Sequence, residues 1–88
     1  MGSRHERTLR AVFEEPARAN IAWSDIEAML VHYGAHREER AGSRVGIEIG
    51  DRRAVFHRPH PQKEASRPLV RAVRDFCVQA GLTPEDQG

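Results

Sequence analysis

The fold is decided by one stretch of the chain, Arg44-Val-Gly-Ile-Glu-Ile-Gly-Asp-Arg-Arg-Ala-Val-Phe-His57. In its first half every second residue is aliphatic, at positions 45, 47 and 49, which is the period of a strand with one buried face. Gly50-Asp51 favours a tight turn, and residues 53–57 predict an antiparallel partner strand. Because a hairpin pairs the start of one strand with the end of the next, we expect Arg44 to lie beside the end of the returning strand.

Two amphipathic helices flank the hairpin in the sequence. Ser24-Asp25-Ile26-Glu27 is a capping box, and apolar residues at helical spacing follow it until Gly34, where this helix is predicted to end. A second helix is predicted from Arg67 to Ala80, because Pro68 suits a first turn and Gly81 is a typical stop. We expect both helices to pack on the single apolar face of the sheet.

Two further elements have weaker patterns. A short helix from about His5 to Glu14 is predicted to lie loosely on the domain, and a strand from about Ala35 to Glu39 would make the sheet three-stranded. The predicted fold class is therefore α+β, with two helices on one face of a three-stranded antiparallel sheet and a short N-terminal helix. We divide the chain into an N-terminal extension (1–20), one domain (21–83) and a frayed tail (84–88).

The composition indicates a globular protein. With 39% hydrophobic and 31% charged residues, the chain is too apolar for a disordered tail, and no apolar run approaches the ~20 residues of a transmembrane helix. The sequence shows no signal-peptide core, so we expect a cytoplasmic protein. Cys77 lies on the apolar face of the last predicted helix, where burial is expected, and a lone cysteine excludes an internal disulfide.

Positive charge is concentrated in one part of the sequence. Residues 35–78 hold ten Lys or Arg against six acidic residues, whereas residues 1–34 carry a net charge of −1 and residues 79–88 a net charge of −2. A basic surface of this kind is typical of proteins that bind a polyanion, although an ordinary solvated surface can have the same composition.

Four short elements follow one another at a distinctive spacing. They are a helix ending in Tyr33-Gly34, Gly42-Ser43 opening a strand, Pro59-His60-Pro61 after the hairpin, and a helix ending in Ala80-Gly81-Leu82. In this order they resemble the HicA family of bacterial toxins, over about residues 22–83. The resemblance implies a double-stranded-RNA-binding-domain-like fold, translation-independent endoribonuclease activity on mRNA, and a HicB antitoxin as the protein partner.

The residue after Gly42-Ser43 departs from the family pattern. The resemblance implies a catalytic histidine at this position, where this chain has Arg44. Cleavage of RNA through its 2′-hydroxyl needs a group that accepts a proton near neutral pH, which histidine does and arginine, with a pKa above about 12, does not. Arg44 can instead hold a phosphate or stabilise the charge of the transition state.

If the chain is a nuclease, the proton transfer falls to His57 or His60, which stand on either side of Arg58-Pro59. The alternative is that these imidazoles fix the loop through a hydrogen bond, or contact phosphate without turnover. The predicted catalytic residues are accordingly His57, His60 and Arg44.

Several other side chains are candidates for RNA binding. Three arginines of the last helix fall at i, i+4 and i+7 and form one basic stripe, which either contacts phosphates or is an ordinary solvated face. Trp23 could stack on a base or pack with Ile21 against its own helix. The full predicted nucleic-acid-binding set is Ser43, Arg44, Arg58, Lys63, Arg67, Arg71 and Arg74.

Three functions remain open from the sequence. The protein is a ribonuclease toxin whose proton chemistry has moved to His57 or His60, an RNA-binding domain that does not cleave, or a module that mainly binds a HicB-like antitoxin. We expect mRNA and such an antitoxin as partners, no membrane, and a monomer when the protein is free. No cofactor is predicted, and no metal site, because no cysteine or acidic residue completes a zinc ligand set with the histidines.

Overall fold

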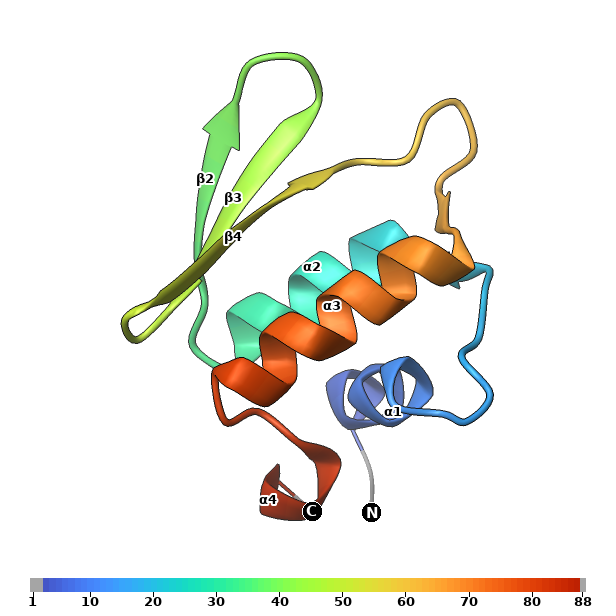
Figure 1. The fold of residues 1–88 in the computed structure, drawn as a ribbon, viewed down its shortest axis with the longest axis vertical. Helices are drawn as coiled ribbons and strands as arrows, with labels where there is room; N and C mark the ends of the chain where they lie inside the picture. The colour runs from blue at the N-terminus through green and yellow to red at the C-terminus, as the bar shows by residue number, and fades with distance from the viewer. Residues whose placement is uncertain (1–2, 88) are drawn as a thin grey trace.

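Three strands form an antiparallel sheet in the order β2-β3-β4 (Figure 1). They are β2 (His36–Arg40), β3 (Arg44–Ile49) and β4 (Arg52–His57). The computed structural model describes residues 3–87, and residues 1, 2 and 88 lie outside the described part. Gly50 turns the β3–β4 hairpin with a φ of 60°, a left-handed backbone that glycine adopts without strain. The hairpin predicted from the sequence is therefore confirmed.

Helices α2 (Trp23–His32) and α3 (Arg67–Gln79) cover the same face of this sheet (Figure 1). The predicted α+β class, with the helix, three strands and helix of a double-stranded-RNA-binding-like domain, is confirmed. Cys77 is buried in the core, as expected, and burial raises the pKa of its thiol to about 12. Over residues 3–87, the helices are all too short or too polar to cross a membrane. The largest fully buried side chains are Leu9, Val12, Ile26, Met29, Leu30, Val45, Ile47, Val70, Val73 and Cys77.

Helix α1 (Arg4–Val12) is part of the core, which corrects the expectation that it lies loosely on the domain. It packs against α2 and α3 on their side away from the sheet (Figure 1). Leu9 and Val12 are both 0% exposed, because α2 and α3 present apolar side chains on this side as well. The chain also forms a short helix, α4 (Pro84–Gln87), where the sequence predicts a frayed tail.

A second, two-stranded sheet joins the starts of the two long helices, and the sequence does not predict it. Strand β1 (Ile21–Ala22) precedes α2, strand β5 (Glu64–Ala65) precedes α3, and the two are antiparallel. The amide of Trp23 donates to the carbonyl of Lys63 at 2.9 Å, which continues this pairing into the first turn of α2. Strands of two residues are too short to show a period in the sequence.

The start of α2 differs from the predicted capping box. Ala22 occupies the N-cap position without a side-chain hydrogen bond, and the helix begins at Trp23. Glu27 does not reach back to the cap; its carboxylate accepts the indole N–H of Trp23 and bonds to arginines outside the helix. Because i and i+4 lie on the same face of a helix, Trp23 and Glu27 are neighbours. In α3, by contrast, Ser66 caps the helix by accepting the amide of Leu69 at 3.4 Å.

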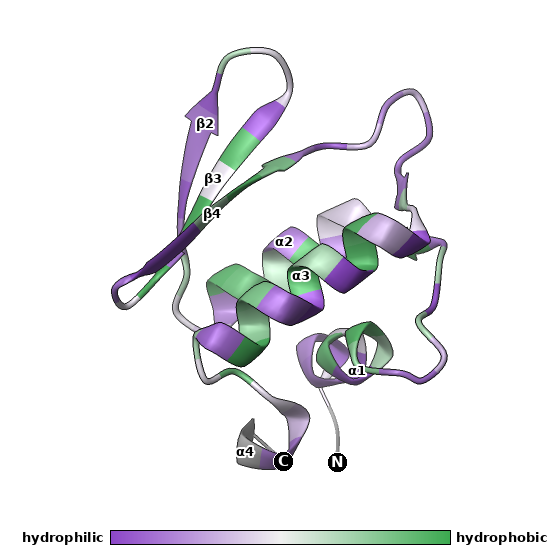
Figure 2. Ribbon diagram, viewed as in Figure 1, coloured by the Kyte–Doolittle hydropathy of each residue, from purple (hydrophilic) through white to green (hydrophobic). Residues whose placement is uncertain are grey.

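The register of the sheet sorts its side chains onto two faces. Val45 lies opposite Phe56 and Ile47 opposite Ala54, and these residues face the helices. The alternate positions face away from the helices and form the outer face. Figure 2 shows this alternation along β3, whereas β2 is hydrophilic along its length. The outer face consists of His36, Glu38 and Arg40 on β2, Arg44, Gly46 and Glu48 on β3, and Arg53, Val55 and His57 on β4.

The burial of α1 predicts that a core substitution in this helix destabilises the whole domain. Leu9→Ala removes a fully buried side chain and leaves a cavity, so we expect the free energy of unfolding to fall by about 3 kcal/mol in urea denaturation. Arg10→Ala is the matched control, because its side chain is 59% exposed and should change stability by less than about 0.5 kcal/mol. Equal stability of Leu9→Ala and the unmodified protein would contradict the placement of α1 in the core.

Candidate functional site

Three basic residues form a row across one end of the outer face. Arg40 on β2 lies opposite Arg44 on β3, and Arg44 lies opposite His57 on β4. Residues directly opposite each other in antiparallel strands share a face, with Cβ atoms about 5 Å apart. All three are exposed. The structure thus places Arg44 beside the end of the returning strand, as the hairpin predicts.

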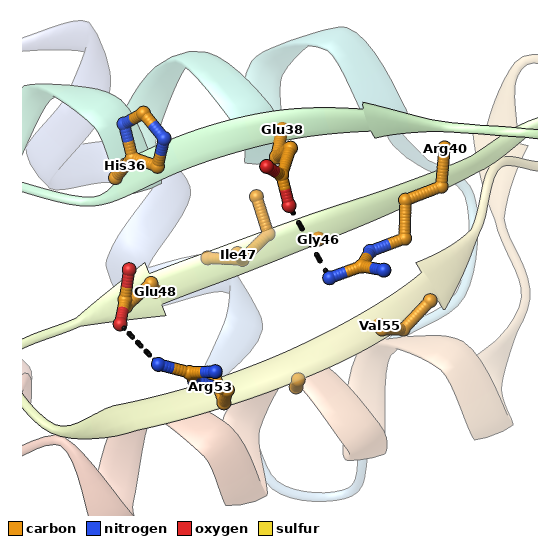
Figure 3. Close-up of a pocket in the computed structure, with 9 residues that line it drawn as sticks. His36, Glu38, Arg40, Gly46, Ile47, Glu48, Arg53 and Val55 are labelled. Carbon is orange, nitrogen blue, oxygen red and sulfur yellow. Dashed lines mark hydrogen bonds and ion pairs between the residues drawn. The ribbon is translucent and has the colours of Figure 1, made fainter.

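The two arginines of the row turn their guanidinium groups away from each other. Arg44 Nε donates to the carbonyl of Ala41 in the β2–β3 turn at 2.9 Å. Arg40 instead lies over Gly46, toward the middle of the face, with one terminal nitrogen 3.3 Å from a carboxylate oxygen of Glu38 (Figure 3). Like charges directly opposite each other in a sheet are destabilising. The row therefore carries a charge arrangement that a bound anion would relieve.

The turn beside the row has an unusual backbone. Gly42 and Ser43 have φ values of 72° and 65°, so the chain passes through two successive left-handed residues, which for serine is unfavourable. The carbonyl of Ser43 accepts the amide of Arg58 at 2.9 Å. This bond extends the β3–β4 pairing by one residue and ties the segment after His57 to the start of β3.

His57 and His60 line the same groove between the end of β4 and α3, together with Leu69 and Ala72 of the helix. Both histidines are exposed. The structure thus brings both predicted proton-transferring residues to one region, with His57 in the row and His60 three residues further along the loop.

Arg58, which the sequence predicts as a phosphate contact, lies inside an ion-pair cluster. Its Nε donates to Glu27 Oε2 at 2.7 Å and one terminal nitrogen donates to Glu27 Oε1 at 3.2 Å. The same guanidinium donates to both oxygens of Glu39, at 2.6 and 2.8 Å. Arg37 adds a bond to Glu27 at 3.1 Å. With two carboxylates bound to it, Arg58 is a structural residue that links α2, β2 and the loop after β4.

Glu27 is ionised in this cluster although its side chain is only 7% exposed. Burial pushes the pKa of the Glu27 carboxyl upward, but hydrogen bonds from Arg58 and Trp23 outweigh burial and hold the pKa below its usual value. A hydrogen bond from Arg58 lowers the pKa of Glu39 as well, and the two carboxylates together raise the pKa of Arg58. The cluster is therefore fully charged at neutral pH.

Trp23 packs in the core, so its indole is not a platform for a base. It is 5% exposed and meets Phe56 edge to face, with ring centroids 5.9 Å apart. Phe56 meets Phe76 of α3 in the same way at 6.0 Å. Since Phe56 precedes His57 in the chain and points to the opposite face, this aromatic packing fixes the strand that carries the imidazole.

The predicted basic stripe of α3 is divided between different roles. Arg67 Nε donates to the carbonyl of Ala17 at 2.8 Å, and Arg74 pairs with Glu15, so the N-terminal extension binds both side chains. Arg71 is exposed between them, and Lys63 is exposed before β5. Of the three arginines in the stripe, Arg71 is therefore the most accessible to a binding partner.

Sequence reasoning misses two residues of this region. Arg40 joins the row only through the β2–β3 register, which the sequence does not give, although its position before Gly42-Ser43 places it near the turn. From the sequence, Glu27 is predicted to cap its helix. Its i, i+4 spacing from Trp23 is the one sequence feature that indicates the contact found between these two side chains.

Comparison with protein families gives one finding. A family model described as the HicA toxin of bacterial toxin-antitoxin systems matches residues 23–82, from the start of α2 to just beyond α3. Searches of curated proteins and of solved structures gave no match to this chain.

The ion-pair cluster predicts a large loss of stability on removal of its buried charge. Glu27→Gln removes the buried carboxylate that bonds to Arg37 and leaves Arg58 with Glu39 alone, so we expect the free energy of unfolding at neutral pH to fall by about 3 kcal/mol. The matched control is Glu48→Gln, which removes an exposed pair with Arg53 and should cost less than about 1 kcal/mol. Urea denaturation of both variants checks this, and equal losses would show that Glu27 acts as a surface residue.

The lowered pKa of Glu27 also predicts a dependence of stability on pH. A carboxyl with a lower pKa in the folded state stabilises the fold above its unfolded value, 4.5, and this stabilisation is lost as the pH falls through the folded-state pKa. We expect the stability difference between the unmodified protein and Glu27→Gln to be constant near neutral pH and to shrink below pH 4.5. A difference that does not change with pH would contradict this assignment.

Proposed function

Because this chain belongs to the HicA toxin family, we propose that it binds mRNA at Arg44 and His57 and cleaves it there. The register that sets Arg44 directly opposite His57 carries this proposal. An arginine provides a permanent cation for a phosphate, and an imidazole provides a group that can exchange a proton. Arg44 on β3 thus supplies the cation, and His57 on β4 supplies the proton-exchanging group that arginine cannot provide at the family's histidine position.

The proposed reaction is a transfer of the phosphoryl group within the RNA. His57 accepts the proton of the 2′-hydroxyl, the 2′-oxygen forms a bond to phosphorus, and the bond from phosphorus to the 5′-oxygen breaks. The 5′-oxygen takes a proton from His60, and the other product ends in a 2′,3′-cyclic phosphate. Arg44 stabilises the negative charge on the phosphoryl oxygens during the transfer. Its guanidinium reaches them by leaving the carbonyl of Ala41, a neutral acceptor.

Further basic side chains extend the proposed RNA contact away from the reacting phosphate. Arg71 and Lys63 are exposed, and Ser43 lies in the turn beside Arg44. We assign Arg58, Arg67 and Arg74 to structural ion pairs and hydrogen bonds, since each is bound to other parts of the chain. For the protein partner we propose a HicB-like antitoxin, as the family implies.

The catalytic proposal predicts that cleavage depends on the imidazole opposite Arg44. We expect His57→Ala to reduce the rate of cleavage of a defined mRNA by at least about a hundredfold, since a positioned acid or base contributes this much. The matched control is His36→Ala. His36 lies on the same outer face, at the opposite end of the sheet from the row, so this variant should cleave RNA at the normal rate. Full activity of His57→Ala would remove the proposed role, and RNA binding without any cleavage by the unmodified protein would establish a binding module instead.

The division of the α3 stripe predicts unequal effects on RNA affinity. Arg71→Gln should weaken binding and lower the slope of log K against log salt concentration by about one phosphate contact. Arg74→Gln should leave that slope unchanged, because Arg74 is bound to Glu15. Affinity measured over a series of salt concentrations separates the two, and a reversed order would place Arg74 at the RNA.

A further inference from the structure

We propose that Arg40 is an additional phosphate-binding residue of this site, which lies folded over Gly46 in the free protein and turns toward the row when RNA is bound. This inference rests on the proposed function, because it assumes that RNA phosphate meets Arg44. It adds a residue that the sequence pattern does not indicate, and it assigns a role to Gly46.

The position of Arg40 is the first observation. Its backbone lies directly opposite that of Arg44, on the same face and at the same end of the sheet. Two cations at opposite positions of neighbouring strands repel each other, and Arg44 is bonded to a backbone carbonyl and not to a carboxylate. A phosphate placed against Arg44 removes this repulsion and attracts both guanidinium groups.

The weak hold on Arg40 in the free protein is the second observation. Its guanidinium has one bond to a carboxylate, at 3.3 Å from Glu38, whose side chain is 62% exposed. Exposed pairs of this kind contribute little to stability. Arg58, by comparison, makes four bonds of 2.6 to 3.2 Å to two carboxylates. Arg40 can therefore leave its position at small cost, whereas Arg58 cannot.

Gly46 makes the folded-back position of Arg40 possible, which is the third observation. A Cβ atom added at Gly46 would lie 2.9 Å from Arg40 Nε and 3.4 Å from a terminal nitrogen of the same side chain. The nearest atoms to this Cβ all belong to Arg40. Figure 3 shows Arg40 extended along the face beside Gly46 toward Glu38. A methyl group at position 46 would thus displace Arg40 and meet the rest of the strand without a clash.

The test measures affinity for a labelled single-stranded 2′-O-methyl RNA, which has the phosphates of RNA but lacks the hydroxyl needed for cleavage. We expect Arg40→Gln and Arg44→Gln each to weaken binding about tenfold, as loss of a charged hydrogen bond does, and to lower the salt slope by about one. Arg53→Gln is the matched control, because it removes a cation from the other end of the same face; it should bind within about twofold of the unmodified protein.

Gly46→Ala tests the folded-back position itself. It should strengthen binding about threefold, because Arg40 no longer has to leave Gly46, and this gain should vanish when Arg40→Gln is also present. Glu38→Gln is a second route to the same result that does not depend on the fold tolerating alanine at position 46. Glu38→Gln should likewise strengthen binding only when Arg40 is present. Glu48→Gln is the control, because it makes the same change in charge without removing the partner of Arg40.

The possible results separate this inference from the proposed function. Weak binding by Arg44→Gln together with normal binding by Arg40→Gln would remove Arg40 from the site and leave the proposed function intact. Normal binding by both would overturn the proposed function and the inference together. An effect of Gly46→Ala that persists without Arg40, together with no effect of Glu38→Gln, would overturn the folded-back position.

Discussion

A carboxylate buried between helix α2 and the sheet constrains the arrangement of the site. Glu27 needs cationic partners because an unpaired charge in the interior costs several kcal/mol, and the chain supplies Arg37 from β2 and Arg58 from the loop after β4. Arg58 also binds Glu39 on β2. Helix, edge strand and loop are thereby fixed to one another at the end of the sheet where Arg44 and His57 lie. Any displacement of this loop would have to break bonds to a buried charge.

The strand register that forms the row is fixed by packing on the opposite side of the sheet. Phe56 lies between Trp23 and Phe76 in the core, so its neighbour His57 must point to the outer face. A shift of β4 by one residue would bury the imidazole and expose the phenyl ring, which the loss of apolar burial strongly disfavours. The distance between Arg44 and His57 is thus set by the hydrophobic core, and the site depends on residues that cannot touch RNA.

The sequence predicts the parts of this structure that have a strong period or a turn signal. The β3–β4 hairpin, α2 and α3 follow from alternation, helical spacing and glycine stops. The β1–β5 pair is too short to have a period, and the burial of α1 depends on apolar surface that α2 and α3 present on their second side. The structural role of Arg58 depends on carboxylates 31 and 19 residues away in the chain, which pattern analysis cannot pair. The position of Arg40 opposite Arg44 follows only from the β2–β3 register.

Three features that are unfavourable for folding alone meet at one end of the outer face. Ser43 has a left-handed backbone, Arg40 and Arg44 are like charges at opposite positions, and Arg44 bonds to a turn carbonyl and not to an acid. Elsewhere on the outer face the opposite arrangement holds, since Glu48 lies directly opposite Arg53 and pairs with it at 2.9 Å. If this surface served only to keep the protein soluble, like charges would not be expected to lie together at one end of it. A site that binds a polyanion, in contrast, requires positive charges close together. The contrast between the two ends of one sheet face therefore supports anion binding at Arg44 independently of the family match.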